Sequence, residues 1–334
     1  MSLYYITNSN WTHFLQSLLR QFSIYAPIKH PPEISYWHKI TNENLSEIVL
    51  DSYRALTPTK SYFFPVKEEI TLEPDMKKTI ILGLKQCDMG HLKTLDAMFL
   101  GGDVKDPYYE NKRKNTILVS SDCEEYAPSC FCTAMESQPF PTEGFDMNLT
   151  SLRNGFLVET GSQICETLVQ ERSRLFQVPQ EFHLNEREDI RKKMTESVIM
   201  NNKDYTWANP HDIVKNNYAS LRWKDFVSTT CVECDACRLI CGTCYCFIID
   251  ELGKDTQRAR AWDSCQSVGY GRVAGGENPR KARFERLRNF YVCKLKNRRE
   301  NFGFYACTGC GRCIDVCQGK IDLRKSLQKI LTEP

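Results

Sequence analysis

Two cysteine arrays near the end of the chain constrain its fold more than any other feature. Both have the spacing C-x2-C-x2-C-x3-C; the first occupies residues 231–241 and the second residues 307–317. Bacterial ferredoxins hold a pair of [4Fe–4S] cubanes with this spacing. Cysteines three apart in a tight loop reach three irons of one cubane, and the fourth cysteine reaches the other cubane. The arrays therefore predict a ferredoxin-like domain with two clusters.

The crossed pattern predicts ligand sets that each combine the two arrays. One cluster is expected to bind Cys231, Cys234, Cys237 and Cys317, and the other Cys307, Cys310, Cys313 and Cys241. Zinc ribbons also use C-x2-C pairs, but a zinc site takes two pairs and has no use for a third cysteine at the same interval. Iron–sulfur ligation is therefore favoured over zinc.

The arrays depart from the bacterial pattern at one position. That pattern places Pro after the fourth cysteine, whereas this chain has Gly242 and Gln318 there. The departure leaves ligation intact and makes the reduction potentials less predictable.

Composition indicates a globular protein of two domains. The chain has 334 residues, of which 41% are hydrophobic and 26% are charged. It contains no apolar run as long as a membrane helix requires and no secretory signal, so the cytoplasm is the expected location. Seventeen cysteines at metal-ligand spacing then indicate thiolates in a reducing, anaerobic setting. A net charge of +2 gives no support for binding to nucleic acid or to a membrane surface.

The predicted fold class is α+β. Residues 1–204 are expected to form a mixed α/β domain, and residues 205–334 the ferredoxin-like domain with a long insert at 242–306. Short apolar runs predict buried strands at 79–84, 116–120 and 155–159. Helical patterns are expected after the polar residues 8–10, at 88–99 and at 214–227.

A second set of cysteines lies in the N-terminal domain: Cys87, Cys123, Cys130 and Cys132. Cys87 follows the predicted strand at 79–84, and Cys123 follows the one at 116–120. Parallel neighbouring strands would bring their carboxyl ends together, where α/β proteins commonly place ligands. The irregular spacing leaves three hypotheses open: a third [4Fe–4S] cluster, a zinc site, or free structural cysteines.

The remaining cysteines give weaker signals. Cys244, Cys246 and Cys265 surround the ferredoxin-like core, and we expect them to pack in it or contact a cluster rather than form a further metal site. Cys165 and Cys293 lie in helical patterns and are expected in the core. His91, four residues after Cys87, is expected at the surface.

Most of the chain resembles one family, which comprises the β subunit of archaeal soluble sulfhydrogenases and the related iron–sulfur subunit of anaerobic sulfite reductase. The resemblance rests on motifs in the same order: Gln86-Cys87-Asp88, Phe99 to Gly102, Asp106 to Tyr109, Cys130-Phe-Cys132, Gly144-Phe-Asp146, Gly242 to Cys246, Trp262 to Cys265, Ala274 to Gly276, and Arg280 to Arg288. The family usually has Pro where this chain has Gly242 and Gln318.

The resemblance implies an electron-transfer subunit that carries out no substrate chemistry itself. It would connect a flavoprotein that oxidises or reduces NAD(P)H with a hydrogenase, sulfite reductase or heterodisulfide-reductase-like subunit. The family's proposed additional cluster falls on Cys87, Cys123, Cys130 and Cys132, and no flavin or nicotinamide is expected on this chain. Two rival interpretations are a sulfur-compound or disulfide reductase with a substrate site near Cys87, and a scaffold in which clusters only stabilise the fold.

Overall fold

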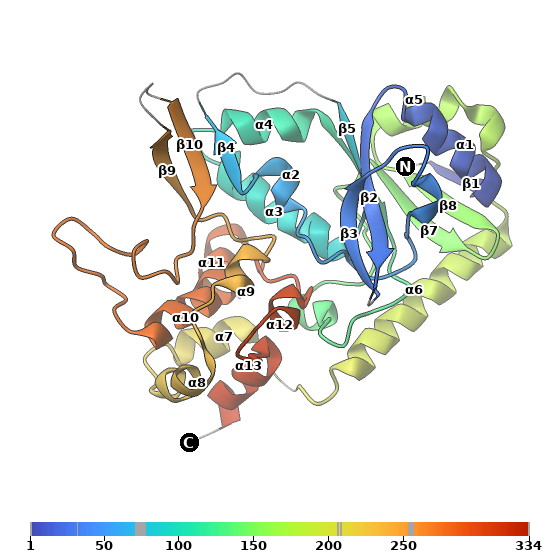
Figure 1. Cartoon of the computed structure of the whole chain (residues 1–334). Coiled ribbons are helices and arrows are strands. Elements are labelled where there is room, and N and C mark those ends of the chain that lie inside the picture. Colours follow the sequence, from blue (N-terminus) through green and yellow to red (C-terminus); the bar gives the residue numbers. More distant parts are fainter. Residues whose placement is uncertain are drawn as a thin grey trace.

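The computed structural model describes residues 2–31, 33–70, 78–205, 207, 209–252 and 257–332. It combines a mixed α/β part, built on a large sheet, with a helical part that carries the two cysteine arrays (Figure 1). The predicted α+β class is confirmed. The predicted boundary at residue 205 falls between two helices and stays a prediction.

A seven-stranded sheet forms the centre of the N-terminal part, in the order β1-β8-β7-β6-β5-β2-β3. Its strands are β1 (Leu3–Thr7), β2 (Ser23–His30), β3 (Ile34–Lys39), β5 (Thr79–Leu84), β6 (Thr116–Ser121), β7 (Met147–Leu152) and β8 (Gly155–Thr160). The four consecutive strands β7, β6, β5 and β2 run parallel, whereas β8, β1 and β3 pair antiparallel with their neighbours. Three of these strands lie where the sequence predicts them.

Helices cover both faces of this sheet, which explains the continuous apolar sequence of β5. Ile80 and Leu82 pack toward α1 (Asn8–Leu18) and α5 (Gln163–Gln170). Ile81 and Leu84 pack on the other face, toward α2 (Lys60–Phe63), α3 (Gln86–Phe99) and α4 (Pro107–Lys114). The helix predicted at 88–99 is thus α3, which begins two residues earlier.

The strand order explains where the N-terminal cysteines lie. β5 pairs with β6 in parallel, so both strands end at the same edge of the sheet. Cys87 lies in the first turn of α3, directly after β5, and Cys123 lies two residues after β6. The long helix α6 (Glu181–Asn201) packs against β7, β8 and the short 3-10 helix at Cys132–Met135.

The C-terminal part is mostly helical. Its helices are α7 (Pro210–Asn216), α8 (Arg222–Thr230), α9 (Ala236–Leu239), α10 (Arg283–Tyr291), the π-helical segment η4 (Val292–Asn297), α11 (Arg298–Phe302), α12 (Arg312–Asp315) and α13 (Leu323–Thr332). The prediction of one continuous helix at 214–227 is wrong, because non-helical residues separate α7 from α8. Asn217 ends α7, and its carbonyl accepts a hydrogen bond from the Trp223 indole at 2.9 Å.

A second, three-stranded sheet connects the two parts of the chain, in the order β4-β10-β9. β9 (Phe247–Leu252) and β10 (Gln257–Trp262) come from the insert between the arrays, whereas β4 (Lys67–Glu69) comes from the N-terminal part. Figure 1 shows this sheet beside α3 and α4 and above the helical part. The insert therefore packs against the N-terminal part as well as the arrays. Among the described residues, every helix is too short or too polar to span a bilayer.

Candidate iron–sulfur sites

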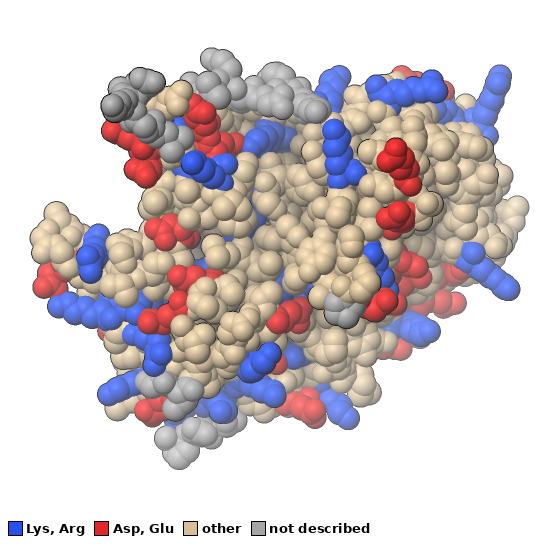
Figure 2. Space-filling view, in the orientation of Figure 1, with Lys and Arg blue, Asp and Glu red and all other residues tan. Residues whose placement is uncertain are grey.

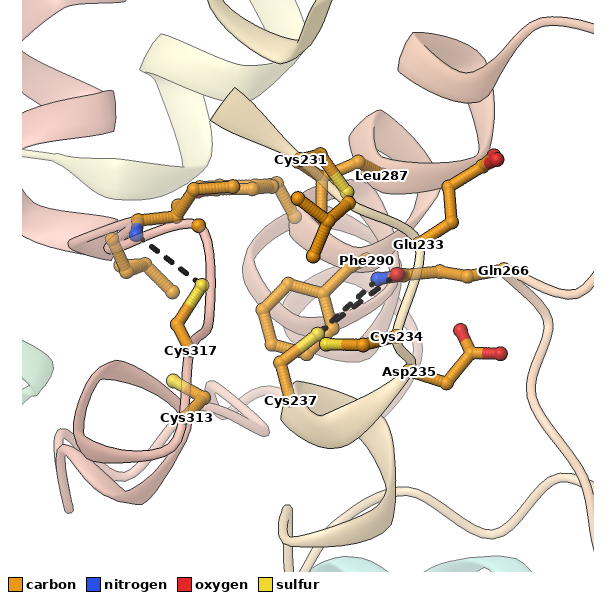
Figure 3. Close-up of a pocket in the computed structure, with 15 residues that line it drawn as sticks. Cys231, Glu233, Cys234, Asp235, Cys237, Gln266, Leu287, Phe290, Cys313 and Cys317 are labelled. Carbon is orange, nitrogen blue, oxygen red and sulfur yellow. Dashed lines mark hydrogen bonds between the residues drawn. The ribbon is translucent and has the colours of Figure 1, made fainter. Parts of the chain in front are cut away.

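Cysteines from the two arrays line a first cavity, cavity A. Its lining includes Cys231, Cys234, Cys237 and Cys317, the four residues of one predicted ligand set, together with Cys313. Figure 3 shows Cys231, Cys234 and Cys237 arriving from one loop and Cys313 and Cys317 from the other side. Gln266 donates from its amide nitrogen to the Cys237 sulfur at 3.6 Å. Cys234 is exposed, so cavity A reaches the protein surface.

The second predicted ligand set lines a deeper cavity, cavity B. Cys241, Cys307, Cys310 and Cys313 all contribute to its wall, with His91, Lys294 and Arg312 beside them. Both predicted crossed sets are thus brought together in space, one around each cavity.

The N-terminal cysteines Cys87, Cys123, Cys130 and Cys132 line a third cavity, cavity C. Two of them follow neighbouring parallel strands, Cys130 lies in the loop that leads into the 3-10 helix at Cys132–Met135, and Cys132 is the first residue of that helix. This convergence is the one expected from the ends of β5 and β6. The wall of cavity C also includes Cys310 from the second array.

The three cavities form a row with shared walls. Cys313 lines cavities A and B, and Cys310 lines cavities B and C. No feature of the sequence predicted that the second array would lie against the N-terminal cysteines.

Two glycines allow this close contact. Gly309 and Gly311 have φ angles of 66° and 75°, in the left-handed region that glycine adopts at little cost. A Cβ atom on Gly309 would lie 2.5 Å from the Cys132 amide nitrogen, and one on Gly311 would lie 2.4 Å from the Ser129 carbonyl oxygen. The Phe131 amide also donates to the Gly309 carbonyl at 2.8 Å. The second array therefore packs backbone against backbone on the N-terminal cysteine loop.

A buried charge network lies between cavities B and C. Arg312 and Asp88 are both fully buried, and an Arg312 guanidinium nitrogen lies 2.7 Å from an Asp88 oxygen. Burial alone would raise the pKa of Asp88, but Arg312 and His91 hold it below its ordinary value. Arg54 donates to the Cys310 carbonyl at 2.7 Å and so adds a second cation to the same wall. These charged residues carry no spacing signal, so sequence analysis missed them.

His91 lies inside the protein, and the expectation of a surface position is wrong. Its side chain is 1% exposed, and its Nε2 lies 3.0 Å from the Thr308 hydroxyl. A Cβ on Gly242 would lie 2.2 Å from the His91 ring, so the imidazole occupies the space beside the residue after Cys241. This contact explains why glycine replaces the usual Pro at that position.

Further buried cations have no carboxylate within salt-bridge distance in the described part of the chain, among them Lys60, Arg238 and Lys294. Lys294 lines cavity B and donates to the Thr243 hydroxyl at 2.8 Å. Lys60 donates to the Cys244 carbonyl at 3.1 Å. Buried cations need nearby negative charge. Their positions around Cys241 and Cys244 favour thiolates or an anionic group in this region.

Burial and charge act in opposite directions on the thiols. Burial raises the pKa of Cys237, Cys307 and Cys123 to about 12. Burial also acts to raise the pKa of Cys310, but His91, Arg312 and Arg54 together lower it to about 5. A metal deprotonates the thiols that bind it, so most of these thiols would lose protons only on ligation.

The donor set at each cavity fits a [4Fe–4S] cluster, which takes four cysteine sulfurs. Among the described residues, no three His, Cys, Asp or Glu side chains are placed to hold a single metal ion. The cysteines line cavities instead of meeting at one point.

Comparisons with known proteins agree with this geometry. Residues 230–321 match the 4Fe-4S dicluster domain family. The chain is 30% identical over 330 residues to the sulfhydrogenase 2 subunit beta of Pyrococcus furiosus, covering 95% of each chain. No solved structure matches this chain.

Proposed function

Because the chain belongs to the sulfhydrogenase β-subunit family, we propose that it is the electron relay of an anaerobic redox complex, with three [4Fe–4S] clusters at cavities A, B and C. The family and its dicluster domain support an iron–sulfur electron-transfer subunit with two clusters. The third cluster and the residues that bind each cluster are part of the proposal.

The proposed ligands are the cysteines that line each cavity. Cavity A would use Cys231, Cys234, Cys237 and Cys317; cavity B would use Cys241, Cys307, Cys310 and Cys313; and cavity C would use Cys87, Cys123, Cys130 and Cys132. When bound, such clusters accept and release single electrons at potentials set by charge, hydrogen bonds to sulfur and exposure.

The shared walls carry the proposal. Cys313 separates cavity A from cavity B, and Cys310 separates cavity B from cavity C, so adjacent sites are one side chain apart. A scaffold would need no such row. The buried cations Arg54, Arg312 and Lys294 lie along it and would offset the negative charge of thiolate-ligated clusters.

One end of the row suggests where a redox partner docks. Cys234 of cavity A is exposed, and the apolar side chains of Val232 and Val268 are 59% and 45% exposed. Figure 2 shows Lys and Arg side chains interspersed with Asp and Glu side chains at the left edge of this view, over the loop after β10 and over α10. We propose that an electron-transfer partner docks there.

The partners would be a flavoprotein that reacts with NAD(P)H and a hydrogenase, sulfite reductase or heterodisulfide-reductase-like subunit. The family relationship supports a multi-subunit complex, and the choice among these partners belongs to the proposal. We place the complex in the cytoplasm.

The rival reductase near Cys87 has less support. A nucleophilic cysteine needs a low pKa and some exposure. Cys87 is 8% exposed, and burial raises the pKa of its thiol well above the ordinary value. Burial therefore works against a thiolate nucleophile at this residue.

The experiment that tests the relay replaces Cys310, the cysteine that lines both cavity B and cavity C. In the assembled complex, Cys310→Ala should block electron flow between the partner subunits while the flavoprotein still reduces dyes with NAD(P)H. The matched control is Cys165→Ala, because Cys165 is fully buried in the core beside α1 and lines none of the three cavities. Full electron flow in the Cys310 variant would refute the relay.

A further inference from the structure

A group of thiols lies outside the three proposed ligand sets. Cys244 and Cys265 contact the guanidinium of Arg238, Cys246 lies beside Cys265, and the relay uses none of these three thiols. Cys244 and Cys265 are each 8% exposed, whereas Cys246 is half-buried. Their positions relative to one another are set by the β9–β10 hairpin.

The hairpin brings Cys246 and Cys265 into contact. The last pair of the β9–β10 ladder is Phe247 with Trp262, and the next backbone hydrogen bond runs from the Asp263 amide to the Cys246 carbonyl at 3.0 Å. Cys246 therefore directly precedes β9, at the same end of the hairpin where Cys265 follows β10. The Cys246 thiol interacts with both the thiol and the backbone amide of Cys265.

Arg238 makes this thiol group electropositive. The side chain is 3% exposed, and its guanidinium donates to the sulfurs of Cys265 and, at 3.5 Å, Cys244. No carboxylate of the described residues forms an ion pair with it. A guanidinium keeps its charge in proteins, so its burial among these sulfurs favours a thiolate within the group.

The two contacting thiols differ in the way that a nucleophile and a resolving cysteine differ. Cys246 is the more exposed, and Tyr270, which is 37% exposed, hydrogen-bonds to its sulfur. The hydrogen bond from Cys265, assisted by Arg238 against burial, lowers the pKa of Cys246 to about 6. Cys265 lies deeper, with Asn289 donating to its sulfur at 3.3 Å. A thiolate near the surface beside a buried partner thiol is the arrangement of a redox-active pair.

A fourth metal site fits the same residues less well. Arg238 lies against the sulfurs of both Cys244 and Cys265, so a metal cation bridging those sulfurs would have to displace a buried guanidinium. The Arg238 side chain forms no other hydrogen bond among the described residues. The position of Arg238 therefore favours cysteines that bind no metal over cysteines that act as metal ligands.

We propose that Cys246 and Cys265 form a redox-active dithiol that reduces low-molecular-weight organic disulfides. The Cys246 thiolate attacks one sulfur of the disulfide, forming a mixed disulfide and releasing the first thiol as a thiolate, which takes up a proton. The Cys265 thiol then loses its proton and attacks the Cys246 sulfur. The mixed disulfide breaks, the second thiol leaves, and a Cys246–Cys265 disulfide remains.

This exchange balances without an outside electron donor, because the two electrons come from the cysteine pair. Return to the dithiol requires two electrons and two protons. The proposed relay is the source of electrons, so this half of the cycle rests on the proposed function. Arg238 connects Cys265 to Cys244, and Cys244 contacts Cys241 of cavity B.

The test uses the anaerobically purified full chain and glutathione disulfide as the probe. After exposure, free thiols are blocked with iodoacetamide and the cysteine peptides are identified by mass spectrometry. In the wild type we expect a peptide linked through Cys246 and Cys265. In Cys265→Ser we expect glutathione to stay attached to Cys246, and in Cys246→Ser we expect neither product. Cys293→Ser is the control and should form the link as the wild type does.

The wild-type labelling keeps the proposal testable even if a variant fails to fold. At pH 7 the adduct on Cys246 should form at least about tenfold faster than any adduct on Cys293. Equal reaction at the two residues, or no adduct in Cys265→Ser, would overturn the proposal. Loss of iron in Cys246→Ser would also overturn it, because Cys246 would then be a cluster ligand. Failure of the relay would leave the exchange products unchanged, so the two proposals are tested separately.

Discussion

The two cysteine arrays have the same spacing and the same backbone path, yet they lie against different neighbours. In the first array, Glu233 and Asp235 have φ angles of 56° and 57°, and in the second the corresponding Gly309 and Gly311 have 66° and 75°. Glu233 pairs with Arg286, and Asp235 accepts hydrogen bonds from Ser264 and Ser267 at 2.8 and 2.9 Å. The second array has no room for such side chains.

The comparison separates two kinds of information in these sequences. Cysteine spacing sets which cavity each sulfur reaches, and it is the same in both arrays. The residues between the cysteines set what each loop packs against: the insert and solvent for the first array, and the N-terminal cysteine loop for the second. Substitutions that exchange these residues between the arrays therefore test which differences affect the stability of the protein.

The largest effect is expected where the arrays differ most in charge. The residue before the third cysteine is Ala236 in the first array and the fully buried Arg312 in the second. Arg312→Ala would leave Asp88 buried and unpaired, which should lower the free energy of unfolding by about 3–5 kcal/mol. Chemical denaturation of the anaerobic protein would measure it.

Two controls sharpen this prediction. Asp88 has a lowered pKa, so the ion pair should contribute at neutral pH and lose its contribution as the pH falls below about 4. The exposed pair Lys93–Glu143 offers the matched control, because Glu143→Gln should cost at most about 1 kcal/mol. A cost of the same size for Arg312→Ala would show that the buried network does not hold the two parts together.

The next effect concerns the positions with positive φ. Gly309→Ala should destabilise the protein by at least about 2 kcal/mol, because the new methyl group would meet the Cys132 backbone and strain a left-handed residue. The corresponding change in the first array, Glu233→Gly, should cost less than Gly309→Ala, because glycine suits the positive φ at this position although the buried Arg286 loses its carboxylate partner. Thermal unfolding of both variants measures the difference. Similar values would mean that the second array does not need close contact with the N-terminal loop.

The smallest effect is expected after the fourth cysteine of each array. Gly242→Pro would place ring atoms against His91 and should cost about 1–3 kcal/mol. Gln318→Pro, at an exposed position, should change stability by about 0.5 kcal/mol or less. Denaturation midpoints of the two variants provide the test, and equal midpoints would remove His91 as the reason for glycine at position 242.

Local patterns predicted much of this molecule, and long-range packing decided the rest. Apolar runs located β5, β6 and β8, and the parallel order of β5 and β6 was sufficient to bring Cys87 near Cys123. The crossed grouping of the array cysteines also followed from spacing. These features depend on residues close in sequence or on one strand pairing.

The missed features all involve contacts between distant segments. The burial of His91 depends on Thr308, more than 200 residues away, and a histidine on a helix carries no sign of such a partner. The contribution of β4 to the insert sheet and the contact of Gly309 with Cys132 have the same origin. The break between α7 and α8 depends on a hydrogen bond from the Trp223 indole, which helical periodicity does not reveal.

The most direct test of the three-cluster relay is the iron, acid-labile sulfide and zinc content of the anaerobically purified chain, measured on the wild type and on Cys123→Ser. Three [4Fe–4S] clusters predict about twelve irons and twelve sulfides per chain, falling to about eight of each in the variant. About eight in both proteins would contradict a cluster at cavity C, and stoichiometric zinc without sulfide would contradict the relay altogether.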